Sequence, residues 1–374
     1  MISRKTPAFV LAALLLVAPA SLFAQTQQQP LTSRELVSML YQLPRNPQKR
    51  DEMVEEIRRR GIGFPLTDGM RSLVATKSGN DALLRRTLEE AERRRVNPTA
   101  SALPPAMEAN DLLERTRNVT LAAANAMPDF IVKQLIRRSI AYGNTTNWVP
   151  QDNLAIAVGF RSNSGEEYKL ISIDGVPAAD DVKPTRDINK YVKGATSSGV
   201  EYISALADIF KPESKTEFRV VDTDVVRERR TLVYEFVVKR EWSTLNLSVG
   251  NASNGTLVGS QGRVWIDREL DRVVRFEQIA TEIPAGFPIT AASTVIDYDW
   301  VMIGERKYLL PVHSEILMTS SQAGIVLQSR NDVRYRSYQK FGAELKVIDE
   351  VGEDDEAPTE TTPPPKPPQP VKKP

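Results

Sequence analysis

The stretch IDYDWVM, residues 296–302, decides the fold class of this chain, because large apolar side chains alternate in it with acidic or smaller ones. Successive side chains of a β-strand point to opposite faces, so a period of two predicts a strand. One face would carry Ile296, Tyr298, Trp300 and Met302, and the other Asp297, Asp299 and Val301. The apolar face has to be covered by helices, by a second sheet or by a ligand.

Further strands are expected around this stretch. They cover residues 216–221, 230–242, 262–267, 272–281, 292–303, 308–318 and 325–338. Turn residues at Asp271, Gly304-Glu305 and residues 322–324 separate the later strands, which predicts an antiparallel meander.

The residues upstream of these strands predict more β-structure and one helix. A strand is expected after Asp129, and a hairpin is expected from residues 154–161 and 168–173, which flank Asn163-Ser164-Gly165. The dipeptide Asp174-Gly175 predicts a tight turn after the hairpin. Residues 201–210 predict a helix that precedes the long strands.

The N-terminal part predicts a small helical module over residues 32–95, with four short amphipathic helices. The expected helix signals are Asn46 as a cap with Pro47 after it, Gly61 as a stop, and Thr67 and Asn80 as caps of the last two helices. The expected buried stripes contain Leu36, Val37, Leu40, Met53, Val54, Ile57, Leu84, Leu88 and Ala91. A Pro-containing linker, residues 96–109, then leads to a helix over 110–127 and to a β domain over 110–349.

The two ends of the chain carry export and tail signals. Arg4 and Lys5 precede an apolar run over residues 8–17, and small residues offer cleavage after Ala24, so residues 1–24 predict a signal peptide. An uncleaved anchor is the alternative. We expect no membrane span after cleavage and a location in the periplasm or outside the cell. Residues 350–374 predict a disordered tail, acidic at 353–356 and rich in proline.

Composition narrows the function classes. The 374 residues have a formal net charge of +1, which gives no electrostatic reason to expect nucleic acid as a partner. The chain has no cysteine, so it lacks disulfides, thiol chemistry and an acylated N-terminal cysteine. An exported domain of this kind has to be stable through its core alone. A bacterial envelope fits this better than a eukaryotic secretory route.

Residues that could carry catalysis or bind a metal are few. His313 is the single histidine, and a lone histidine on a strand is more often structural or solvated than catalytic. No G-x-S-x-G elbow, P-loop or dinucleotide fingerprint is present. Asp297 and Asp299 could start a Ca²⁺ site, but a solvated face is the simpler interpretation. We therefore expect a protein that is not an enzyme and has no cofactor and no metal; a hydrolase would need a carboxylate pair in a cleft.

Aromatic and aliphatic residues of the β part form the candidate binding site. The candidate residues for an apolar cavity are Phe130, Trp265, Phe276, Tyr298, Trp300 and Leu310. Such a set either fills a core or lines a space for an acyl chain, and both need inward apolar side chains.

One hairpin adds a family resemblance. Residues 262–268, GRVWIDR, followed by residues 272–277, RVVRFE, resemble the hairpin of proteins with the fold of the lipoprotein carriers LolA and LolB. Residues 128–138 resemble the first strand of a group of bacterial envelope proteins with that hairpin. The resemblance implies an α+β fold, mainly antiparallel β, in which helices cover a curved, incomplete barrel. Residues 178–250 depart from the carriers, and the helical module resembles interaction units of varied bacterial proteins.

Two functions are expected from these observations. The first is an exported, non-catalytic envelope protein that binds a lipid-like or amphipathic ligand, a lipid or a lipoprotein, on the concave face of its sheet. The alternative is a scaffold that binds an envelope protein partner through the helical module and the Pro-rich tail. The sequence does not identify the ligand, the partner or the oligomeric state.

Overall fold

A computed structural model describes most of the chain. It covers residues 29–99, 102–143, 145–162, 165–179, 181–186, 203–248, 255–322 and 324–341. The expected signal peptide, residues 1–24, and the expected tail, residues 350–374, lie outside the described residues. Within the described residues, no helix combines the length and the apolar character that a membrane crossing requires.

Four helices form the N-terminal module. They are α1 (Ser33–Gln42), α2 (Lys49–Arg60), α3 (Asp68–Lys77) and α4 (Ala82–Val96). Thr32 starts α1 with a capping box that includes Glu35, and Thr67 caps α3 as predicted. Gly61 ends α2 with a φ of 68°, a conformation that glycine adopts without strain. The apolar stripes of the four helices pack into one core, which includes Leu36, Ile57, Val74, Leu84 and Leu88.

Two predicted caps of this module are wrong. Asn46 lies in a turn before α2, where its amide donates to the carbonyl of Gln42, and α2 begins only at Lys49. Asn80 has a φ of 61°, so its backbone is left-handed and cannot act as an N-cap, which is typically extended. The neighbouring Asp81 caps α4 instead, because its carboxylate accepts a hydrogen bond from the amide of Leu84 at 2.8 Å.

Two further helices flank the β-structure. They are α5 (Ala106–Asn125) and α6 (Ile203–Phe210). The predicted start of α5 at residue 110 is four residues late, because the helix begins at Ala106, directly after Pro105 at the N-cap. The predicted helix over 201–210 is present as α6 over its described residues.

Eleven strands of the described chain form one open antiparallel sheet. They are β1 (Phe130–Tyr142), β2 (Val149–Arg161), β3 (Gly165–Ile173), β4 (Val176–Pro177), β5 (Glu217–Val226), β6 (Arg229–Val238), β9 (Gly259–Asp267), β10 (Arg272–Thr281), β11 (Ile289–Ile303), β12 (Arg306–Gln322) and β13 (Ile325–Lys340). Their order is β4-β3-β2-β1-β13-β12-β11-β10-β9-β6-β5, so β9 to β13 form the predicted meander. Strand β1 pairs with the last strand, β13, and thereby joins the first hairpin to the meander. The short strands β7 (Asn246–Ser248) and β8 (Gly255–Leu257) form a separate pair.

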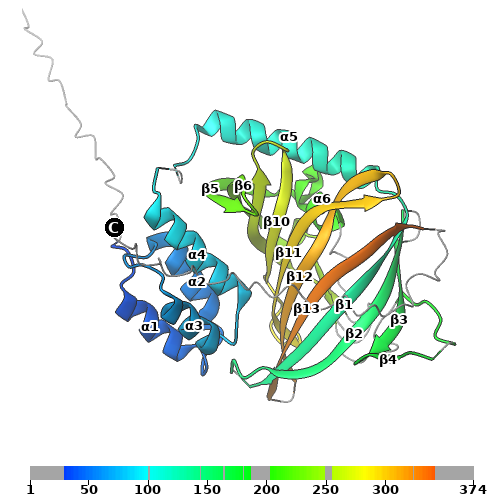
Figure 1. Cartoon of the computed structure of the whole chain (residues 1–374), viewed down its shortest axis with the longest axis horizontal. Helices are drawn as coiled ribbons and strands as arrows, with labels where there is room; N and C mark the ends of the chain where they lie inside the picture. The colour runs from blue at the N-terminus through cyan, green and yellow to red at the C-terminus, as the bar shows by residue number, and fades with distance from the viewer. Residues whose placement is uncertain are drawn as a thin grey trace, which may run out of the picture.

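The helices lie on both faces of the sheet, which gives an α+β architecture with a curved, incomplete barrel, as expected. Figure 1 shows α1–α4 as one group beside the sheet and α5 running across it. On β10, Phe276 packs in the cluster that contains residues of α5 and α6, whereas its neighbour Glu277 binds Arg58 of α2. We call the face toward α5 and α6 the inner face and the face toward α1–α4 the outer face.

The alternation predicted for residues 296–302 holds only in its first half. Ile296 and Tyr298 are each 1% exposed, whereas Trp300 and Met302 are 41% and 48% exposed. The pairing of β11 with β12 shifts register between Asp297 and Tyr298, which indicates a β-bulge. A bulge changes the side to which the following residues point, and here Ile303 is buried in place of Met302.

Candidate functional site

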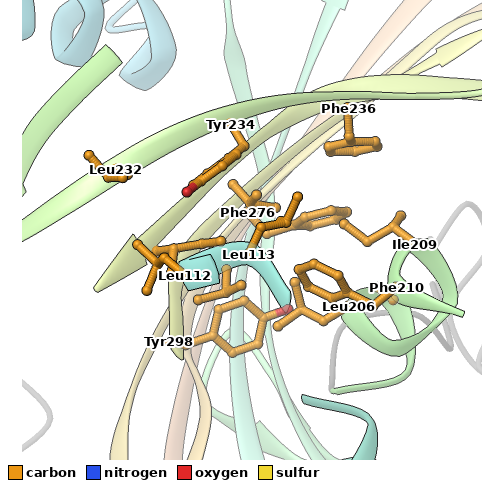
Figure 2. Close-up of a cluster of buried hydrophobic side chains, with 14 of the residues drawn as sticks. Leu112, Leu113, Leu206, Ile209, Phe210, Leu232, Tyr234, Phe236, Phe276 and Tyr298 are labelled. Atoms are coloured by element: carbon orange, nitrogen blue, oxygen red, sulfur yellow. The ribbon is translucent and has the colours of Figure 1, made fainter. Parts of the chain in front are cut away.

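The inner face is covered by an apolar cluster that two helices close. Figure 2 shows side chains of α5 and α6 packed against those of the strands. The helices contribute Leu112, Leu113, Leu206, Ile209 and Phe210, and the strands contribute Leu232, Tyr234, Phe236, Phe276 and Tyr298. Rings stack within and beside this cluster, with centroids 5.6 Å apart for Phe236 and Phe276.

Polar contacts also tie these helices to their surroundings, such as the hydrogen bonds of Arg115 on α5 to Asp271 and of Thr244 to Asp208 on α6. The hydroxyl of Tyr234 donates to the carbonyl of Ala109 on α5 at 2.7 Å, and burial raises the pKa of this tyrosine, so it remains a neutral donor. The guanidinium of Arg117 on α5 donates to the carbonyl of Phe210 at the end of α6 at 2.8 Å. The contact of α6 with the sheet itself is made by apolar side chains.

The six residues expected to line one cavity do not meet at one place. Phe276 and Tyr298 belong to the inner-face cluster. Phe130 and Leu310 belong to a second buried cluster, where Phe130 stacks on Phe160 with centroids 5.1 Å apart.

The other two predicted residues lie elsewhere. Trp265 is fully buried in a small cluster with Val226, Val233 and Val274 toward the outer face, and its indole N–H donates to Asp224 at 2.9 Å. The predicted position of Trp300 on a covered apolar face is wrong, because its side chain is exposed beyond the bulge.

The outer face meets the helical module through buried charges, and we call this contact the seam. Glu277 on β10 accepts hydrogen bonds from Arg58 of α2 at 2.8 Å and from Arg86 of α4 at 3.4 Å. Arg94 of α4 lies 3.0 Å from the carboxylate of Asp222 on β5. Burial alone would raise the pKa of Glu277, but the neighbouring guanidinium groups outweigh it and lower that pKa.

Two other carboxyl groups of the seam have raised pKa values. Burial raises the pKa of Glu90 on α4 to about 7, and the negative charge of Asp224 adds to this shift, which Arg58 opposes. Burial also raises the pKa of Glu315 on β12, with a contribution from Asp81. At neutral pH the seam therefore contains carboxyl groups that resist ionisation beside others that are fully ionised.

His313 is part of an ion-pair network rather than a solvated strand position. Its Nε2 lies 3.2 Å from a carboxylate oxygen of Asp332, and its Nδ1 lies 3.8 Å from Asp297. Burial lowers the pKa of His313, but the two carboxylates outweigh this effect and raise it to about 9. Arg275 also binds Asp297, at 2.7 Å, so His313 lies in a charged cluster. In the described part of the chain, no group of three His, Cys, Asp or Glu residues could hold a metal ion.

Several cavities lie along the seam. One of about 490 Å³ lies between α2 and strands β9–β12, where Arg58, Arg263 and Glu277 reach its walls. Two of about 420 Å³ flank α4, one beside α3 and the other beside the end of β5. A fourth, of about 250 Å³, lies near Trp148 and Asp81. These cavities lie where the helical module meets the sheet.

Comparison with known proteins finds solved structures of low similarity to this chain. No protein-family model matches the sequence, and no curated protein matches it. A LolA superfamily protein from Nitrosomonas europaea is 11% identical, with 62% of this chain and 96% of that chain covered at a TM-score of 0.30. A DUF1329 family protein from Desulfovibrio piger is 7% identical, with coverage of 64% and 97% and a TM-score of 0.30.

A more distant structure is a complex of two proteins. The MucA/MucB complex of Pseudomonas aeruginosa contains a chain that is 10% identical, with 60% of this chain and 94% of that chain covered at a TM-score of 0.17. Likeness of this degree carries no argument about ligand or activity. The function has to be inferred from the residues of the two covered faces.

Proposed function

We propose that this chain is an exported, non-catalytic binding protein of the bacterial envelope, and that the apolar part of an amphipathic ligand packs against the inner face. The supporting observation is the way in which α6 covers the sheet. It contributes Leu206, Ile209 and Phe210 to the inner-face cluster, and hydrogen bonds from Arg117 to its last carbonyl and from Thr244 to Asp208 add to this contact. An acyl chain offers the same kind of contact as these side chains, so it could take their place.

The free energy lost when the α6 side chains withdraw is similar in size to the free energy gained when an acyl chain is buried in their place. Burial of a Leu, Ile or Phe side chain contributes about 1.5–3 kcal/mol, so withdrawing three of them costs roughly 5–9 kcal/mol. Burial of an acyl chain contributes about 0.8 kcal/mol per methylene, so about ten methylenes offset that loss. A ligand with a chain of that length would exchange with α6 at little net change in apolar burial.

Extraction of the native protein tests this function. The protein is purified from the cells that produce it, extracted with organic solvent and analysed for acyl lipids by mass spectrometry. We expect about one lipid per chain, and a reduced amount in a Leu232→Gln variant, which places a polar group on the strand face that the acyl chain would contact. Leu88→Gln on α4 is the matched control, because Leu88 is equally buried but belongs to the core of the helical module. A native protein free of lipid would contradict the proposal.

The envelope location rests on residues 1–24 and has its own test. We expect the mature protein to begin at Gln25, the residue that follows the expected cleavage site at Ala24. N-terminal sequencing of protein from a periplasmic fraction measures this directly. Recovery of the chain with Met1 still attached, in the cytoplasmic fraction, would contradict export.

A protein-interaction scaffold is the second candidate. The observation that favours it is the helical module, which has its own apolar core and presents exposed residues such as Tyr41, 58% exposed on α1, away from that core. A photoreactive amino acid at position 41 should then cross-link to one partner protein in intact cells. Absence of any cross-link at this position, with expression unchanged, would count against the scaffold.

A further inference from the structure

We propose that the cavity of about 420 Å³ between α3, α4 and the β5–β6 turn is a second ligand site, which takes a single-chain amphipathic anion such as an alkyl phosphate or a fatty acid. Its volume lies within the range of about 300–1,000 Å³ that is usual for small-molecule sites. It lies toward the outer face, on the opposite side of the sheet from the inner-face cluster. The argument is independent of the function proposed for the inner face.

The cavity has an apolar wall made by both parts of the molecule. Leu66, Val74 and Leu88 come from the helical module, and they are at most 5% exposed. Val225 and Val226 come from the end of β5, on the opposite side. An alkyl chain placed between them would lose contact with water on both sides, which favours its binding.

The charged groups that line the cavity are mainly arginines, six of them against two glutamates. They are Arg71, Arg85, Arg86, Arg93, Arg227 and Arg275, with Glu89 and Glu90. Four of the arginines are already bound to carboxylates: Arg71 to Glu89, Arg86 to Glu277, Arg93 to Asp224 and Arg275 to Asp297.

The other two arginines keep donors for a ligand. Among the described residues, the hydrogen-bond partner of Arg85 is the neutral amide oxygen of Asn80, at 2.8 Å. Arg227 donates to main-chain carbonyls, including that of Tyr298, and its nearest described carboxylate is Asp299 at 3.8 Å. Arg85 comes from α4 and Arg227 from the turn between β5 and β6, so an anion between them would be bound from both walls. Guanidinium groups suit carboxylates and phosphates in particular, because their N–H donors match the spacing of two oxygens.

The turn geometry and the buried acid support this assignment. Arg227 and Glu228 have φ values of 47° and 65°, so they form a tight left-handed turn that fixes the position of the Arg227 main chain. Glu89 is neutralised by Arg71, and burial raises the pKa of Glu90 to about 7. The two glutamates therefore repel an anion less than two free carboxylates would.

Calorimetric titration of the full chain with dodecyl phosphate tests the site. We expect binding that Arg85→Ala and Arg227→Ala each weaken by about tenfold or more, because each removes charged hydrogen bonds. The matched control is Arg59→Ala, an arginine of α2 that pairs with Glu56 and does not line the cavity. All three arginines are surface positions, and circular dichroism checks that the variants fold.

The outcomes separate this site from the inner face. Loss of binding in both cavity variants, with Arg59→Ala unchanged, supports the assignment. Unchanged binding of dodecyl phosphate in Arg85→Ala and Arg227→Ala would overturn it, since the ligand would then occupy another site. Binding of uncharged dodecyl maltoside with equal affinity and equal sensitivity to both variants would overturn the anionic part. Neither result bears on whether lipid is extracted with the native protein.

Discussion

Glu277 of β10 accepts a hydrogen bond from Arg58 of α2 at 2.8 Å, and these two residues are 219 positions apart in the sequence. Both side chains are at most 7% exposed, so the helical module is attached to the sheet through a buried ion pair. Taking two charges out of water is costly, and their mutual attraction repays this only when both partners are present. Such a pair specifies where the module lies on the sheet more than it adds stability.

Removing one partner of this pair should therefore destabilise the protein strongly. We expect Glu277→Gln to lower the free energy of unfolding by about 3–5 kcal/mol, because Arg58 and Arg86 would both lose their carboxylate. Urea unfolding measures the change. The control is Glu56→Gln on the surface of α2, which pairs with the half-exposed Arg59 and with Arg60 and should change stability by about 1 kcal/mol or less. Equal effects of the two substitutions would contradict a buried seam.

Glu90 should make stability fall as the pH rises. Its pKa of about 7 in the folded protein exceeds the ordinary value of 4.5, so the folded state binds a proton that the unfolded state has released. The stabilising effect of this proton is complete below about pH 4.5 and is lost as the pH rises through 7. Relative to the native chain, Glu90→Gln should gain stability across this window, on the order of 3 kcal/mol at its upper end. Urea unfolding at a series of pH values measures the difference, and a constant difference would contradict the assignment.

His313 should also make stability fall as the pH rises, but at higher pH than Glu90. Its pKa is raised from 6.5 to about 9 by Asp297 and Asp332, so the charged imidazolium stabilises the fold below about pH 6.5. That contribution is lost as the pH rises through 9. We expect His313→Gln to be less stable than the native chain at pH 6 and nearly equal to it at pH 10, as followed by thermal unfolding. A difference that grows above pH 9 would contradict the ion-pair role.

The two tryptophans of the predicted site should differ in their effect on stability. Trp265 is fully buried and donates to Asp224, so Trp265→Ala should cost about 3–5 kcal/mol. Trp300 is 41% exposed, so Trp300→Ala should cost about 1 kcal/mol or less. Guanidinium unfolding followed by circular dichroism compares them. A loss for Trp300→Ala as large as that for Trp265→Ala would contradict the exposed position of Trp300.

Much of the β-structure follows from local patterns. Strand β10 has the predicted ends at residues 272 and 281, because Asp271, with a φ of 54°, supplies a turn immediately before it. Thr67 caps α3 for the same local reason. The prediction of Asn80 as a cap is wrong because Asn and Asp are both good caps, and the choice between these neighbours depends on the backbone conformation after Gly79.

The candidate sites could be predicted less well, because they depend on long-range contacts. A period of two places Val264 and Trp265 on opposite faces but does not say which face meets α5 and which meets α4. The bulge that turns Trp300 outward depends on pairing with β12. The sequence does contain an indication of the seam. Arginines such as Arg58 and Arg86 recur in α2 and α4, and acidic residues lie on the polar face of the strands. That signal identifies charged partners only once both elements are placed.

The exchange of α6 for a ligand is tested most directly by chemical labelling of one buried position. The chain has no cysteine, so Leu206→Cys introduces a single thiol on the face of α6 that packs on the sheet, 3% exposed. We predict slow reaction with a maleimide in the ligand-free protein and faster reaction when monolaurin, an uncharged acyl glycerol, is added. Leu88→Cys, in the core of the helical module, should react slowly in both cases. A Leu206→Cys labelling rate that monolaurin leaves unchanged at saturating concentration would contradict the account.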